Sequence, residues 1–77
     1  MKALYFSILK EKLKAEFEEI EFSGKVSELR RLLIEKYPEL EDILKVSRFA
    51  VNYEYVGEDF ELKGEEVVAV IPPVSGG

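Results

Sequence analysis

The residues best suited to chemistry are the last six, and none of them has a charged side chain: Pro72-Pro73-Val74-Ser75-Gly76-Gly77. Proline cannot donate a ladder hydrogen bond, so the two prolines should end the preceding strand and lead the backbone away along an extended path. Gly76 and Gly77 have no Cβ, so their backbone can enter a slot that any side chain would block. We therefore expect residues 72–77 to form an extended, flexible tail. The alternative is an ordinary frayed terminus.

The composition argues against chemistry by side chains. The chain contains no histidine and no cysteine. It therefore lacks the side chain best suited to proton transfer near neutral pH, a thiolate nucleophile, and the usual ligands of zinc, haem and iron–sulfur clusters. Carboxylates with strongly shifted pKa values would need a pocket that a domain of 77 residues rarely has. We expect no metal site and no bound cofactor, and leave open whether the chain counts as an enzyme.

The charge balance also narrows the possible partners. The net charge is −5, whereas nucleic-acid binding needs a basic face. No apolar run approaches the length of a membrane span, and the chain does not open like a signal peptide. The sequence therefore predicts neither a nucleic-acid nor a membrane partner, and a cytoplasmic location.

The strands next to the tail must position it. Residues 67–71 are apolar at every position, which predicts a central strand and is compatible with parallel pairing to the first strand. That first strand is predicted over 2–9, where Leu4, Phe6 and Ile8 would share one face. Both of its faces are largely apolar, so one can pack on a helix. The other either packs on a second layer, as in a central strand buried on both sides, or meets a partner.

The middle of the chain alternates between connector, strand and helix. Residues 10–15 form a charged connector with room for one helical turn. Together with a second strand over 16–22, this connector predicts an antiparallel hairpin, with Ile20 and Phe22 facing the core. The clearest helix spans 26–37, with an apolar stripe that Pro38 ends. Residues 39–45 should form a short turn that tucks against the core through Leu40, Ile43 and Leu44.

The second half predicts a further hairpin before the last strand. A strand from Arg48 should reverse near Asn52 and return to Gly57. Tyr53 and Tyr55 share a parity and would form an aromatic patch on one face. Gly64 is predicted to take a left-handed conformation in the connection to the last strand.

The summed pattern predicts an α+β domain over 1–71. Its mixed sheet would have four to five strands, with one main helix, about 26–37, packed on one face. A single helix leaves the other face open and partly apolar, and such patches usually mark binding surfaces.

This arrangement resembles the β-grasp fold of ubiquitin-like proteins and, more narrowly, the MoaD family of sulfur carriers, the small subunits of molybdopterin synthase. The resemblance covers essentially the whole chain. It rests on Phe6, Val26, Leu29-Arg30, Ala50-Val51-Asn52, Leu62, Gly64, Glu66-Val67 and, most specifically, the ending Ile71-Pro72-Pro73-Val74-Ser75-Gly76-Gly77.

The resemblance implies a mechanism centred on the carboxyl group of Gly77. A ubiquitin-activating-enzyme-like adenylyltransferase would use ATP to adenylate this group, and sulfur would then displace AMP to leave a thiocarboxylate. The tail, residues 72–77, would enter the large synthase subunit of a heterotetramer and give its sulfur to the pterin precursor of the molybdenum cofactor. In this picture ATP is bound by the activating partner and the catalytic groups belong to the partners.

The resemblance also implies that Phe6, Tyr55 and Ile71 meet the large subunit, whereas ordinary core packing is the alternative for each. Glu65 and Glu66 would steer docking or simply form a solvated turn. Other functions stay open: a carrier for thiamine or tungsten-cofactor synthesis, a protein modifier conjugated through Gly77, or a β-grasp interaction domain whose Gly-Gly is incidental.

Overall fold

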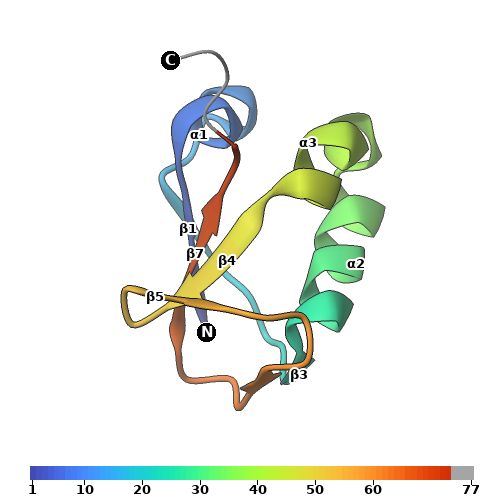
Figure 1. Cartoon of the computed structure of the whole chain (residues 1–77). Helices are drawn as coiled ribbons and strands as arrows, with labels where there is room; N and C mark the ends of the chain where they lie inside the picture. Colours follow the sequence, from blue (N-terminus) through green and yellow to red (C-terminus); the bar gives the residue numbers. More distant parts are fainter. Residues whose placement is uncertain (74–77) are drawn as a thin grey trace.

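A computed structural model describes residues 1–73 of the chain (Figure 1). The main sheet and a two-stranded ladder account for seven strands, and three α-helices and one 3₁₀ turn connect them within this range. In chain order the elements are β1 (Lys2–Tyr5), α1 (Ser7–Leu13), β2 (Phe17–Glu19), β3 (Gly24–Lys25), α2 (Val26–Lys36), the 3₁₀ turn η1 (Pro38–Leu40), α3 (Glu41–Val46), β4 (Arg48–Val51), β5 (Glu54–Val56), β6 (Glu61–Leu62) and β7 (Val67–Ile71).

The main sheet has five strands in the order β2-β1-β7-β4-β5. Its last strand, β7, lies at the centre, parallel to β1 and antiparallel to β4. The predicted parallel pairing of the first and last strands is therefore confirmed. Val67–Ile71 could take this place because it is apolar on both faces and carries no proline or glycine.

The core lies between one face of this sheet and helix α2 (Figure 1). From the sheet it takes alternate residues of three strands, and from α2 it takes a stripe at helical spacing. These elements contribute to the core Ala3 and Tyr5 of β1, Val68 and Val70 of β7, Phe49 and Val51 of β4, and Val26, Leu29 and Leu33 of α2. The α+β class and the main helix on one face are confirmed.

Helix α2 begins and ends where local chemistry dictates. The Glu28 carboxylate accepts a 2.8 Å hydrogen bond from the Lys25 amide. This bond satisfies one of the backbone N–H groups at the helix start that have no acceptor within the helix. The helix ends at Lys36, one residue before the predicted end, and the Tyr37 amide still donates to the carbonyl of Leu33. Pro38 then opens η1, and Leu40 and Leu44 are buried as predicted, with Ile43 at the margin of the core.

The first predicted strand was too long. It ends at Tyr5, and residues from Ser7 on form α1 in place of strand and charged connector. Ser7 has a φ of 53°, which turns the backbone out of the strand, and Leu9 is fully buried on the new helix. The error arose because Leu4, Phe6 and Ile8 alternate as in a strand even though Ile8 already lies in a helix.

The second predicted strand, 16–22, was also too long. It pairs only over Phe17–Glu19, after which the chain leaves the sheet with Ile20 buried and Phe22 half-buried against the core. The small ladder of β3 with β6 was not predicted. It pairs Gly24 with Leu62 and brings the start of α2 to residues 61–62. Two-residue strands are too short to show a period.

Candidate functional site

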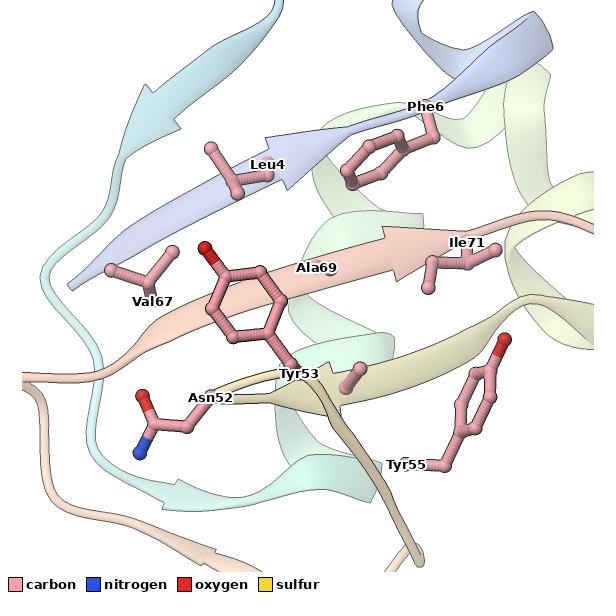
Figure 2. A pocket seen from close by; sticks show the side chains of 9 residues that line it. Leu4, Phe6, Asn52, Tyr53, Tyr55, Val67, Ala69 and Ile71 are labelled. Atoms are coloured by element: carbon pink, nitrogen blue, oxygen red, sulfur yellow. The ribbon is translucent and has the colours of Figure 1, made fainter.

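An apolar hollow of about 350 Å³ lies on the sheet face opposite α2 (Figure 2). It draws on β1, β4, β5 and β7 together with the turn between β4 and β5. The residues that line it are Leu4, Phe6, Ala50, Asn52, Tyr53, Tyr55, Val67, Ala69 and Ile71. The predicted open and apolar second face is therefore present, and it is concave.

The hollow exists because small side chains stand at the centre of the sheet. Ala69 of the central strand is paired on one side with Leu4 of β1 and on the other with Ala50 of β4. Two adjacent alanines lower the floor, and larger side chains rise around them. Ala50 and Ala69 were not predicted as site residues, because only their pairing across β4 and β7 brings them together.

The three predicted interface residues lie at one end of this hollow. Figure 2 shows Phe6, Ile71 and Tyr55 together at the end toward which β1 and β7 run. Phe6 is 43% exposed and Tyr55 is 63% exposed, while Ile71 is half-buried. Core packing therefore does not account for Phe6 or Tyr55.

The cation Arg48 lies beside this end. Its guanidinium carbon stands 5.7 Å from the centroid of the Tyr55 ring, a cation–π distance. Arg48 is paired with Ile71 across β4 and β7. A smaller hollow of about 280 Å³ adjoins it, lined by Val46, Arg48, Tyr55, Ile71, Pro72 and Pro73.

The tail begins at the same end of the hollow. Pro72 is buried and Pro73 is exposed, so the packed part of the chain includes the first residue of the expected tail. Both prolines lie outside β7, in agreement with their predicted role in ending the strand. The predictions for Val74, Ser75, Gly76 and Gly77 fall outside the residues that the structure describes.

The Glu66 carboxylate is held in the turn before β7. It accepts hydrogen bonds from the amides of Lys63, Gly64 and Glu65 at distances between 2.9 and 3.1 Å. These backbone hydrogen bonds, led by that of Lys63, lower the pKa of Glu66. Gly64 has a φ of 106°, so the predicted positive φ is confirmed. Glu66 therefore stabilises the turn into the central strand.

A polar network that local sequence patterns do not reveal lies on the helix side of the sheet. The Glu18 carboxylate accepts hydrogen bonds from the hydroxyls of Tyr5 at 2.7 Å and Tyr37 at 2.8 Å, and it pairs with Lys36. Burial alone would raise the pKa of Glu18, but these hydrogen bonds, led by that of Lys36, outweigh it and lower the pKa. Burial and the hydrogen bond to Glu18 raise the pKa of Tyr5 and of Tyr37.

Arg30 is the centre of a second polar network on the helix side of the sheet. Its guanidinium donates to both carboxylate oxygens of Glu58 and to the carbonyl of Ser47 at 2.7 Å. It also lies 4.8 Å from the Phe49 ring. This bidentate pairing with Arg30 lowers the pKa of Glu58. Both polar networks therefore hold the scaffold together behind the hollow.

The part of the chain that the structure describes contains no cluster of three or more His, Cys, Asp or Glu side chains that could hold a metal ion. Within residues 1–73, no helix combines the length and apolar character needed to cross a membrane.

Sequence comparison shows where this scaffold belongs. The profile of the ThiS family matches residues 3–77, nearly the whole chain. The chain belongs to the ThiS family. Among curated members, the chain is 42% identical over 81 residues to a molybdopterin synthase sulfur carrier subunit from Caenorhabditis briggsae, an alignment that covers 100% of this chain and 96% of the relative.

Solved structures of similar proteins share the fold of this ThiS-family chain. A putative molybdopterin converting factor, subunit 1, from Pyrococcus furiosus is 30% identical with a TM-score of 0.79, and the match covers 95% of each chain. A protein–protein complex of subunits 1 and 2 of molybdopterin-converting factor from Helicobacter pylori contains a chain that is 26% identical, with a TM-score of 0.68. That match covers 99% of this chain and 96% of the other. The resemblance to the β-grasp carriers is therefore confirmed.

Proposed function

We propose that this ThiS-family chain is the sulfur carrier subunit of a molybdopterin synthase and that its reactive group is the carboxyl group of Gly77. The observation that carries the proposal is the 42% identity to a carrier of this kind over the whole chain. The geometry supports it, because the strand that leads to the tail ends beside an open apolar hollow. The proposal requires that Gly77 bears a free α-carboxylate in the working protein.

The chemistry needs two displacements at the carboxyl group. A carboxylate is a poor acyl donor, so one of its oxygens attacks the α-phosphorus of ATP on an activating enzyme and pyrophosphate leaves. A sulfur nucleophile of the sulfide class then attacks the acyl carbon, and AMP leaves to give a thiocarboxylate. In the synthase the thiocarboxylate sulfur attacks an electrophilic carbon of the pterin precursor and displaces the oxygen substituent of that carbon. Water then cleaves the acyl–sulfur bond, so the carboxylate returns and the sulfur stays on the pterin.

The carrier itself contributes presentation to these steps. Gly76 and Gly77 place no side chain near the acyl carbon, so it is open to attack and fits the slots of two different enzymes. With no His or Cys in the chain, proton transfer and nucleophilic catalysis come from the partners. ATP is bound by a ubiquitin-activating-enzyme-like adenylyltransferase. We further propose a cytoplasmic location for the carrier, with neither nucleic acid nor membrane as a partner.

The large synthase subunit is the proposed occupant of the hollow, in a heterotetramer of two small and two large subunits. Support comes from the Helicobacter pylori relative, whose structure is a complex of subunits 1 and 2. Phe6, Tyr55 and Ile71 are the proposed contacts, because they surround the end of the hollow from which the tail departs. Docking there would bury large aromatic and aliphatic side chains close to Pro72 and would direct the tail into the partner.

The proposal is tested by the intact mass of the chain after incubation with its cognate activating enzyme, ATP and a sulfur source. We expect a mass increase equal to the replacement of one oxygen by one sulfur. The reaction without ATP is the control and should leave the mass unchanged. If complete reactions give no such increase, the chain is not a sulfur carrier. Co-purification with the large synthase subunit then selects the molybdopterin pathway over a thiamine pathway.

A further inference from the structure

The turn between β4 and β5 holds a tyrosine, Tyr53, in a left-handed backbone conformation. Val51 pairs with Glu54, so Asn52 and Tyr53 alone connect the two strands. Both have a positive φ, 51° for Asn52 and 68° for Tyr53. Such two-residue turns favour asparagine followed by glycine, because the backbone must be left-handed at both positions. Asn52 fits this rule, whereas Tyr53 is a bulky residue that the left-handed region disfavours.

Folding does not compensate for this strain at Tyr53. Its relative exposure is 103%, so its ring is as accessible as in an extended chain and gains nothing from burial. The ring nevertheless lines the apolar hollow. A strained residue with an unused aromatic ring at the edge of a concave surface points to a contact made only in a complex.

Tyr53 also lies away from the contacts already proposed. Val51 is paired with Val68, so the turn that follows it stands at the Val67 end of β7. Ile71, where the tail departs, lies four residues farther along, or roughly 13 Å at the rise of a strand. Figure 2 shows Tyr53 with Asn52 and Val67 toward one end of the hollow, and Phe6, Ile71 and Tyr55 toward the other.

We propose that Tyr53 is a second aromatic anchor for the large synthase subunit, at the end of the hollow remote from the tail. This inference rests on the proposed function and adds a determinant of partner affinity to it. The partner supplies apolar side chains against the Tyr53 ring and a polar group that accepts a hydrogen bond from its hydroxyl. Tyrosine suits this role because its ring offers a large contact area with few rotatable bonds.

Because Tyr53 lies far from the start of the tail, its loss should change the affinity for the large subunit and not the rate of sulfur transfer within the complex. A contact so far from Ile71 stabilises the complex equally before and during sulfur transfer, so its loss weakens binding without slowing the bound step. A residue that only shapes the turn would leave affinity unchanged when glycine replaces it, since glycine adopts the same backbone conformation without strain.

The test compares the wild-type chain with the variants Tyr53→Gly and Lys14→Gly. Lys14 is a matched control because it also has a positive φ, 55°, but ends helix α1 outside the hollow. Each chain is loaded with sulfur and titrated against the cognate large subunit. The Kd of this complex, the KM and kcat of sulfur transfer for the loaded chain, and the melting temperature of the chain are measured.

We expect Tyr53→Gly to raise Kd and KM at least about tenfold, which is the effect of losing an interface anchor. Its kcat at saturation should equal that of wild type. Its melting temperature should equal that of wild type or rise. Lys14→Gly should match wild type in Kd. An unchanged Kd for Tyr53→Gly overturns the inference, as does a loss of affinity that merely follows a loss of stability. The proposed function fails separately, if the wild-type chain gains no sulfur or does not bind the large subunit.

Discussion

The hydroxyl of Tyr5 on β1 donates a 2.7 Å hydrogen bond to Glu18 on the neighbouring edge strand β2. Tyr37 and Lys36, at the end of α2, bind the same carboxylate. One acidic side chain therefore joins two strands to the main helix, directly behind the strand that leads to Phe6. Stability of this corner depends on Glu18 being ionised.

The first prediction is that the folded chain loses stability at acid pH as Glu18 becomes protonated. The folded-state pKa of Glu18 lies below its ordinary value of 4.5, so the unfolded chain binds more protons and folding stability rises with pH in this range. The contribution of Glu18 is complete above about pH 4.5 and is lost as pH falls through the lower folded-state pKa. Denaturant unfolding at a series of pH values measures this slope.

The variant Glu18→Gln isolates this effect from those of Glu58 and Glu66, whose pKa values are also lowered. It keeps an acceptor for the tyrosine hydroxyls but cannot titrate, so its stability should depend less on pH below 4.5 than that of wild type. Identical pH slopes for the two proteins would contradict the assignment. Glu18→Ala should cost about 1–3 kcal/mol at neutral pH, because the buried Tyr5 hydroxyl loses its acceptor.

The second prediction concerns the turn before the central strand. Gly64 has a φ of 106°, and a Cβ added there would lie 3.2 Å from the carbonyl oxygen of Phe22. Gly64→Ala should therefore lower the free energy of unfolding by about 1–3 kcal/mol. Gly57→Ala is the matched control, because a Cβ there meets nothing within 4 Å and its stability change should stay within about 0.5 kcal/mol. Equal effects in urea unfolding would show that the Gly64 backbone is not restrictive.

The third prediction tests the hollow as a docking surface. Ala69→Leu places a larger side chain on its floor, between Leu4 and Ala50, and should block a complementary partner surface. We expect the Kd for the large synthase subunit to rise at least about tenfold, with little change in melting temperature. Ala15→Leu makes the same chemical change outside the hollow and should bind normally. Normal binding by the Ala69 variant would place the interface elsewhere.

The fourth prediction separates the tail from the fold. Deletion of Gly77 should abolish sulfur loading in the mass assay, because the chain then ends at Gly76 and its carboxyl group stands one residue short of the site where the activating enzyme adenylates it. The melting temperature should stay at the wild-type value, because the core formed by residues 3–70 does not include the tail. A large drop in melting temperature would instead give the tail a structural role.

Local patterns predicted the elements that are long or sharply bounded. Helix α2 was predicted because its apolar stripe ends at a proline, and β7 because five apolar residues precede two prolines. Helix α1 was anticipated only as a single turn within the connector over 10–15, because Phe6 and Ile8 continue the alternation of β1 and the strand ends before Ser7, which has a positive φ. A local pattern does not reveal a backbone turn at a residue that usually avoids it.

The site was predictable in part. Phe6, Tyr55 and Ile71 came from the resemblance, and the structure places them around one hollow, although their contact with a partner stays a prediction. Tyr53 was expected to form one aromatic patch with Tyr55, but the turn places the two tyrosines toward opposite ends of the hollow. The floor was not, because Ala50 and Ala69 matter only through their register across β4 and β7. Glu18 and Tyr37, 19 residues apart, meet only when the sheet and helix have packed.

The central place of β7 has a consequence for how the chain acquires its shape during synthesis. β1 and β4 both pair with β7, so the two halves of the sheet stay unjoined until residues 67–71 have been made. The pairing of the first strand with the last also makes the contacts highly non-local, which slows folding. A nascent or prematurely terminated chain without β7 therefore presents two open strand edges and no assembled docking hollow. Partners that recognise the hollow would thus select chains whose translation has passed Ile71.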